Sequence, residues 1–346
     1  MGAVIFVLFL VFIHRKKGWS VLVTGGAGYV GSALVSKLLE RGHRVIVLDL
    51  YLFGEDALNG VRNHVNLREI KGDIRDPRLL ETALSGCDAV IHLACISDES
   101  SYDLDPGRSK SINFDAFGPF VQAAKKAGVK RFIYASSSCV YGSTNDAQAT
   151  EDQPLGPLSG FSKHKALCET VLHQERAPGF VTCIVRPANI CGYAPLQRLD
   201  IAVNALTHTA FKEGRIKVSG GTRIYPSIHI DDMVNLYLFL LGQPDARIDG
   251  KVYNAVSENS TLIELAETVR RVVREDLSIE SEAEENTPSY PVSSDRMLHE
   301  LGFKPSHTTE DAIRGLAATF QTGDVPNSFA YPRYSNVKMM QRVDLG

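Results

Sequence analysis

The sequence predicts an α/β fold built on a doubly wound parallel sheet, with a smaller substrate-binding domain toward the C-terminus. From Ser20 onward, short β-branched runs alternate with helical stretches, which is the order of a parallel sheet covered on both faces. The runs are continuously apolar, as expected for strands buried on both faces. The glycine-rich turn 25–31 (Gly-Gly-Ala-Gly-Tyr-Val-Gly) follows the first run and opens a helix. That context is typical of a Rossmann fold.

The elements are expected in a regular order up to Pro187 and an irregular one after it. We expect strands at 21–24, 44–49, 66–70, 89–94, 130–135 and 181–186, with helices at 32–41, 77–84 and from 106 to 127. Beyond these we expect a helix at 201–212, a strand at 216–218, a helix after 231 and a solvated acidic loop at 280–285. Thr261 and Glu264 form a capping box that opens a further helix.

Four regions follow from this order. Residues 1–17 are an apolar segment with a basic cluster, and 18–190 are the Rossmann domain. Residues 191–320 are mainly the substrate-binding domain, although part of 226–255 is expected to return to the first domain. Residues 321–346 are rich in Pro, Asn, Ser and Tyr, which predicts a loosely ordered tail.

Composition and charge argue against several classes of function. The 346 residues are 44% hydrophobic and 22% charged, an ordinary globular composition. A net charge of −3 without a long basic run argues against a nucleic-acid partner. The six cysteines form no C-x-x-C pair and no cluster with zinc-ligand spacing, which predicts a reducing compartment and no metal.

The N-terminus leaves two interpretations open. Residues 3–13 are apolar and the basic cluster 14–17 follows them. The run is shorter than the roughly 20 residues of a membrane span, and its charge stands on the wrong side for a secretory signal. Either residues 3–17 give a weak membrane association, with the globular part on the cytoplasmic side, or they are packed on the fold or precede the true start. Both interpretations predict a cytoplasmic protein.

The glycine turn and one carboxylate point to the cofactor NAD. Gly25 allows the tight turn, Gly28 lets a diphosphate approach the backbone, and Gly31 lets helix and strand pack closely. The diphosphate is expected at the helix N-terminus. Asp49 ends the second strand, where a carboxylate accepts hydrogen bonds from the ribose hydroxyls and repels a 2′-phosphate. No Lys or Arg follows within 50–53, so the sequence favours NAD over NADP.

Further motifs resemble the extended short-chain dehydrogenase/reductases. They stand at 72–76, 92–94, 134–137, 140–142, 186–189 and 228–232, and the resemblance runs from about residue 19 to 320. It implies an NAD-dependent nucleotide-sugar epimerase or dehydratase of carbohydrate metabolism, an isomerase or lyase that is often a homodimer. It also implies further cofactor contacts from Tyr29, Val30, Asp73, Ile74, Leu93, Ala94, Ser136, Lys165, Pro187, Asn189 and Ile190.

The same resemblance places the reacting groups, and one of them is missing. The family pairs a Tyr with a Lys four residues later and adds a Ser or Thr. Lys165 matches the lysine because Glu169 follows it as the family's acid often does, and Ser137 matches the serine. Phe161 therefore stands at the tyrosine position. A phenyl ring can neither take nor give a proton, and loss of a general acid or base costs about 10²–10⁴-fold in rate.

Three interpretations of Phe161 stay open. Another group substitutes for the phenol, the protein is a catalytically impaired or non-catalytic NAD- or sugar-nucleotide-binding relative, or the phenylalanine is an engineered Tyr→Phe change. Cys139 resembles the proton-transfer cysteine of GDP-mannose 3,5-epimerases and GDP-fucose synthases, and a lysine nearby would lower its pKa. A packed structural thiol is the equal alternative. His164 is a weaker substitute, expected at the surface or a subunit contact.

Substrate contacts are implied for Asn113, Ser138, Asn189, Arg198, Asp200 and Arg223. Ser138 and Cys139 replace the acidic pair usual in sugar dehydratases, which argues against ordinary 4,6-dehydration. An alternative for Asn113 is a helix-interior amide bonded to a nearby carbonyl. The leading hypothesis is a reaction through a 4-keto sugar intermediate with NAD retained.

Overall fold

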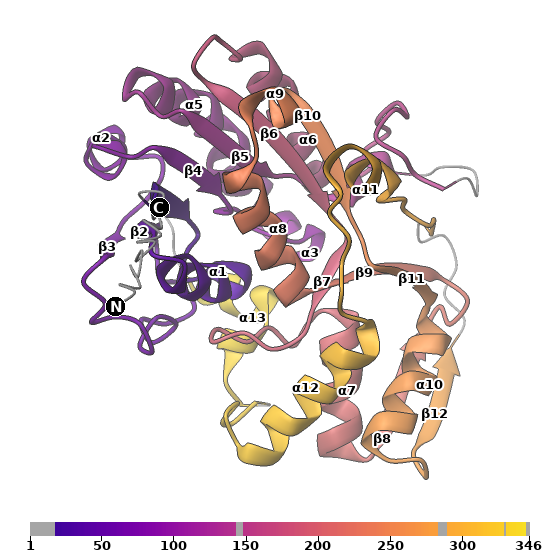
Figure 1. The fold of residues 1–346 in the computed structure, drawn as a ribbon. Coiled ribbons are helices and arrows are strands. Elements are labelled where there is room, and N and C mark those ends of the chain that lie inside the picture. The colour runs from indigo at the N-terminus through magenta and orange to yellow at the C-terminus, as the bar shows by residue number, and fades with distance from the viewer. Residues whose placement is uncertain (1–17, 143–147, 283–288, 329, 344–346) are drawn as a thin grey trace, which may run out of the picture.

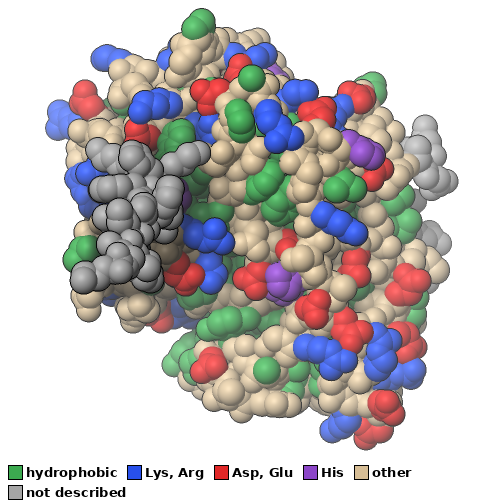
Figure 2. Space-filling view, viewed as in Figure 1, with side chains coloured by type: hydrophobic (Ala, Val, Ile, Leu, Met, Phe, Trp, Pro, Cys, Tyr) green, Lys and Arg blue, Asp and Glu red, His purple; other side chains and the backbone are tan. Residues whose placement is uncertain are grey.

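The computed structural model describes residues 18–142, 148–282, 289–328 and 330–343. The predicted apolar segment 1–17 lies outside the described residues. Within them, no helix combines the length and apolar character needed to cross a membrane. Figure 2 shows acidic and basic side chains interspersed over the face in view, without a large field of one sign.

A seven-stranded sheet, parallel throughout, confirms the predicted fold class. Its strand order is β10-β6-β5-β4-β1-β2-β3. The strands are β1 (Ser20–Thr24), β2 (Arg44–Asp49), β3 (Leu67–Lys71), β4 (Ala89–His92), β5 (Arg131–Ala135), β6 (Val181–Pro187) and β10 (Lys251–Ala255). The order reverses between β1 and β4, and ligands of such sheets bind beyond the strand ends at this switch point.

Two layers of helices cover this sheet because successive residues of each strand face opposite sides. Val21 and Val23 join a core cluster with α1 (Tyr29–Glu40) and α8 (Ile230–Gly242), which lie beside each other on one face (Figure 1). Leu22 joins the opposite cluster. That cluster includes α2 (Pro77–Leu84), α5 (Phe117–Lys126) and α6 (Gly160–Gln174).

The predicted helical stretch at 106–127 is confirmed in extent, but it contains a π-helical turn. The chain forms α3 (Glu99–Asp103), α4 (Pro106–Lys110), a π-helical turn at Ser111–Asp115 and then α5. The π turn contains Asn113, whose side-chain amide donates to the Ile96 carbonyl at 2.9 Å and accepts from the Ile96 N–H at 2.8 Å. The π-helical turn thus occurs where an inward polar side chain holds the loop after β4.

The second domain packs α7 (Ala202–Glu213), α10 (Leu262–Val273) and α12 (Thr309–Thr322) around one apolar cluster. The capping box of Thr261 and Glu264 is confirmed. Smaller sheets join β7 (Asn189–Cys191), β9 (Ile224–His229) and β11 (Glu258–Thr261), and β8 (Arg215–Ser219) with β12 (Ser278–Glu282). Short helices α9 (Asp245–Ile248) and α11 (Asp295–Leu301) pack instead against β6 and β10 of the seven-stranded sheet.

Two expectations for this half of the chain are wrong. Residues 280–282 belong to β12, which pairs in parallel with β8, instead of a solvated loop. Its acidic side chains are exposed, so the strand's polar sequence reflects its solvent-facing position. The described tail is also ordered: it forms a 3-10 turn at Pro332–Tyr334 and α13 (Asn336–Met340), which packs beside α3.

Candidate active site

The glycine turn between β1 and α1 forms a cradle without room for side chains. Gly25 has a left-handed backbone with φ of 71°, and a Cβ there would lie 2.7 Å from the Ala94 nitrogen. A Cβ on Gly31 would lie 2.1 Å from the Gly25 oxygen. Helix α1 begins after Gly28 with no side-chain cap and no acidic residue in its first turn. Its N–H groups and dipole therefore favour an anion such as a diphosphate.

Asp49 ends β2 at the same edge of the sheet. Its carboxylate accepts hydrogen bonds from the backbone nitrogens of Tyr51 at 2.7 Å and Ala27 at 2.9 Å. Burial raises the pKa of this carboxyl group, and the two N–H donors oppose the rise. The bonds fix the carboxylate beside the glycine turn, where it can accept from the hydroxyls of an adenosine ribose.

One cavity of about 430 Å³ joins the turn, Asp49 and the ends of the central strands. Its size is that of a small-molecule or cofactor site. The cradle, the uncapped helix and the carboxylate fit a dinucleotide. Every residue for which the sequence predicted a cofactor contact lines this cavity: Gly25, Gly28, Tyr29, Val30, Asp49, Asp73, Ile74, Leu93, Ala94, Ser136, Lys165, Pro187, Asn189 and Ile190.

Lys165 and Phe161 share one face of α6, four residues apart, and both line the cavity. The Lys165 ammonium donates to the Ala135 carbonyl at 2.7 Å and lies 3.5 Å from the Cys95 sulfur. It also stands 5.7 Å above the centre of the Phe161 ring. The ring is 6% exposed, so this part of the cavity is an apolar wall beside an oriented cation.

Ser137 also lines the cavity. It precedes the 3-10 turn Ser138–Tyr141, and its hydroxyl oxygen accepts from the Cys139 backbone nitrogen at 3.3 Å. That bond leaves the hydroxyl hydrogen available as a donor. Ser137 and Lys165 therefore place two donors at one end of the cavity.

Cys139 does not line the cavity, and its surroundings favour the second alternative, a packed structural thiol. Burial raises the pKa of the thiol to about 12, which outweighs the opposing effects of Ser137 and the Lys165 charge. His164 also lies outside the cavity lining. Its ring nitrogen bonds the Tyr102 hydroxyl at 2.6 Å, and its ring stacks on Phe114.

A buried ion pair supports the reacting end from behind. Arg186 donates to both carboxylate oxygens of Glu169, at 3.0 and 2.6 Å, and both side chains are buried. The Ser136 hydroxyl donates to the same carboxylate, and Arg186 also bonds the Tyr141 hydroxyl at 2.8 Å. The guanidinium of Arg186 is therefore used within the protein, where it joins β6 to α6.

The residues with implied substrate contacts are only partly brought together. Asn189, Arg198 and Asp200 line the cavity, whereas Asn113, Ser138 and Arg223 do not. Asn113 is occupied by the Ile96 backbone. Ser138 offers its carbonyl to the Tyr290 hydroxyl at 2.9 Å.

The two arginines of this set differ in their partners. Arg198 forms ion pairs with Asp98 at 2.9 Å and Asp200 at 2.6 Å. Arg223 forms no ion pair with a carboxylate of the described chain, and its Nε is buried without a hydrogen-bond partner there. Arg223 is thus the arginine that still lacks an anion.

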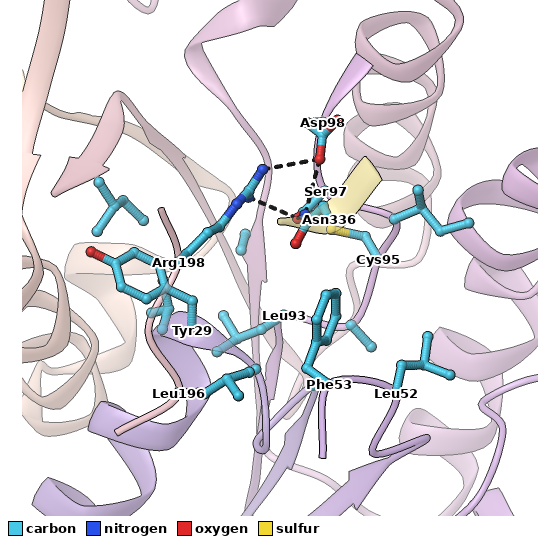
Figure 3. A pocket seen from close by; sticks show the side chains of 18 of the residues that line it. Tyr29, Leu52, Phe53, Leu93, Cys95, Ser97, Asp98, Leu196, Arg198 and Asn336 are labelled. Carbon is cyan, nitrogen blue, oxygen red and sulfur yellow. Dashed lines mark hydrogen bonds and ion pairs between the residues drawn. The ribbon is translucent and has the colours of Figure 1, made fainter. Parts of the chain in front are cut away.

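Several cavity residues escaped the sequence analysis. Among them are Cys95, Ser97 and Asp98 after β4, Tyr225 of β9, and Arg333 and Asn336 of the tail. Figure 3 shows Arg198, Ser97, Asp98 and Asn336 gathered on one side of the pocket, with Phe53 and Leu52 on another. Asp98 could have been noticed in the sequence as a helix-capping residue, since it caps α3. The tail residues carry no such signal.

The fold and the cavity together define a Rossmann-type dinucleotide-binding protein. The model of the NAD dependent epimerase/dehydratase family matches residues 21–255, so the chain belongs to that family, and NAD is its cofactor. Agl12 of Haloferax volcanii, a low-salt glycan biosynthesis protein, is 31% identical over 242 residues, which are 68% of this chain and 76% of Agl12.

Two further relatives cover more of the chain. A 3-beta-hydroxysteroid dehydrogenase of Mycolicibacterium neoaurum is 28% identical over 335 residues, covering 85% of this chain and 89% of that protein. The structure of DesIV from Streptomyces venezuelae, a dTDP-glucose 4,6-dehydratase with NAD bound, has a TM-score of 0.79 and 27% identity. It covers 91% of this chain and 99% of DesIV.

Proposed function

We propose that the protein acts on a nucleotide-diphosphate sugar as an epimerase or dehydratase, through a 4-keto intermediate. One observation carries the proposal: a single cavity connects Asp49 and the glycine turn to Ser137, Lys165 and Phe161. Bound NAD supplies the hydride acceptor. The likeness to DesIV, a sugar-nucleotide dehydratase, supports the substrate class.

The chain's own residues then have distinct tasks. Lys165, held by the Ala135 carbonyl, orients the nicotinamide ribose and stabilises negative charge on the reacting oxygen. Ser137 donates a hydrogen bond to the C4 oxygen of the sugar. Phe161 shapes the cavity and excludes water without moving a proton, so oxidation at C4 is slow unless another group accepts the hydroxyl proton.

Arg223 is the proposed contact for the sugar-nucleotide phosphates. Burial raises the pKa of Tyr225, a cavity residue, to about 12, and the charges of Arg198 and Arg223 oppose the rise. Arg223 therefore lies within electrostatic reach of the cavity, and its unpaired Nε favours an anionic partner. Arg198 already has two carboxylates, which makes it the weaker candidate.

A second candidate function is a non-catalytic protein that binds NAD and a sugar nucleotide. Phe161 favours it, because the ring cannot transfer a proton, and so does the raised pKa of Cys139. Both candidates keep the NAD site, the sugar-nucleotide site and a cytoplasmic homodimer, so binding is tested first and turnover separately.

Native mass spectrometry tests the shared part of the proposal. The protein loaded with NAD is mixed with UDP-glucose, dTDP-glucose or a 3-beta-hydroxysteroid. We expect a ternary complex with a sugar nucleotide, lost in Arg223→Gln and kept in the control Arg215→Gln, which removes an exposed charge paired with Glu213. The proposal would be contradicted if the steroid bound and neither UDP-glucose nor dTDP-glucose did.

A further inference from the structure

The C-terminal residues 331–336, here called the strap, run from the second domain to the mouth of the cofactor cavity. Arg333 and Asn336 are cavity-lining residues although they lie some 300 positions after the glycine turn. No local pattern indicates this role, since the segment has the polar, proline-containing composition of a free tail.

The middle of the strap is anchored in an apolar cluster. Tyr334 is 7% exposed and packs with Leu316 and Phe320 of α12. Its carbonyl accepts from the Leu199 nitrogen at 2.8 Å, and its hydroxyl donates to the Pro326 carbonyl at 3.0 Å. Arg333 and Asn336, on the two sides of Tyr334, therefore have a fixed base from which to reach the cavity.

One end of the strap closes on the loop after β4. The Asn336 side-chain amide donates to the Ser97 hydroxyl at 2.7 Å and to the Asp98 carboxylate at 2.9 Å, as Figure 3 shows. Its backbone N–H donates to Asp200 at 2.7 Å. Arg198 bonds the same two carboxylates. The strap, this loop and the segment before α7 are thus joined in one network at the cavity wall.

The other end closes on the loop after β2. Both terminal nitrogens of Arg333 donate to the Asp56 carboxylate, each at 2.8 Å. This loop follows Asp49 and supplies Leu52 and Phe53 to the cavity, so Arg333 stands at the adenosine end. Its Nε–H is buried and has no partner in the described chain. A buried donor without an acceptor is unfavourable, which favours an acceptor on a ligand in the cavity.

We propose that the strap is part of the NAD site. Arg333 donates from Nε to the adenosine half of the cofactor, and the contacts with Asp56 and with Ser97 and Asp98 hold the strap across the cavity. NAD then leaves only after these contacts break, which makes its release slow. The inference concerns cofactor retention and does not depend on the substrate.

Release kinetics test the proposal directly. The protein is loaded with NADH, an excess of NAD is added, and the loss of bound-NADH fluorescence gives the dissociation rate. We expect Arg333→Ala and Asn336→Ala each to raise this rate about tenfold or more, as expected for loss of a hydrogen bond to a charged or closely held partner. Lys338→Ala is the control, since it removes an exposed charge from the same tail.

A second measurement separates a cofactor contact from a structural one. Arg333→Lys keeps a cation for Asp56 but removes the Nε donor, so it should fold normally and still release NADH faster. If Arg333 only stabilised the fold, its variants would lower the melting temperature without NAD and leave the NAD-induced increase unchanged. We expect that increase to shrink, and NAD to slow hydrogen exchange at 331–336 in the unmodified protein. Unchanged release in all three variants would overturn the proposal.

Discussion

The two ends of the cavity differ in how completely they are equipped. At the cofactor end, the glycine cradle, the uncapped helix and Asp49 are all in place. At the proposed reaction end, Ser137 and Lys165 line the cavity, but the Phe161 side chain has no acidic or basic group and burial raises the pKa of Cys139. We therefore expect the protein to bind NAD as other family members do, but to turn over substrate slowly or not at all.

This difference shows that cofactor binding and proton transfer depend on separate features of the protein. Cofactor binding rests on backbone shape and one carboxylate, which many contacts of the fold maintain. In the proposed reaction, proton transfer would rest on a single phenolic oxygen, which Phe161 lacks. The Glu169–Arg186 pair still holds Ser136 and Tyr141 behind the site. A positioned serine and lysine thus surround a missing acid–base group.

Restoring the phenol should have the largest effect. In Phe161→Tyr, oxidation of a bound sugar nucleotide should rise by a factor of about 10² or more, because a general base again stands beside Lys165. Single-turnover formation of reduced nicotinamide measures the step. The same change in a Lys165→Met background is the control and should give little gain. No gain with any sugar nucleotide that binds would favour the non-catalytic function.

Removing the charge of Asp49, the proposed partner of the adenosine ribose, should have the next largest effect, at the cofactor end of the cavity. Asp49→Asn keeps the shape of the side chain but loses its charge, so NAD affinity should fall about tenfold or more. NADP affinity should fall less, since the carboxylate no longer repels its phosphate. Calorimetry with both cofactors measures the change, and the exposed Asp103→Asn serves as the control. An unmodified protein that binds NADP more tightly than NAD would contradict this assignment.

The two ends of the cavity also differ in how far the sequence predicts them. The cofactor end was predictable because a turn, a helix start and a strand end are neighbours in the chain, and all of the predicted contacts line the cavity. The positions of Arg333 and Asn336 at the cavity were not predictable, because they depend on Tyr334 packing against α12. The raised pKa of Cys139 was also not predictable from the sequence, because it arises from burial, which outweighs the lowering effect of the lysine charge.

Cys139 should show the smallest effect of the residues singled out in the sequence. With a pKa near 12, only about one thiol in 10⁴ is ionised at pH 8, and the thiolate is the reactive form. Alkylation of Cys139, followed by peptide mass mapping, should therefore accelerate about tenfold per pH unit from pH 7 to 10. Deprotonation at that pKa leaves no inflection in this range.

Proton exchange at the sugar should also change little when Cys139 is replaced. A 4-keto sugar nucleotide in D₂O exchanges hydrogen at C3 or C5 without hydride transfer, so the step bypasses Phe161. If Cys139 is a packed thiol, Cys139→Ala and Cys139→Ser should both exchange within about twofold of the unmodified protein. A loss of 10²–10⁴-fold in both variants, together with an alkylation inflection between pH 6 and 8 once the sugar is bound, would show that the substrate lowers the thiol pKa. Cys139 would then be the proton-transfer group at C3 or C5, and the C4 hydroxyl proton, which Phe161 cannot take, would still need another acceptor.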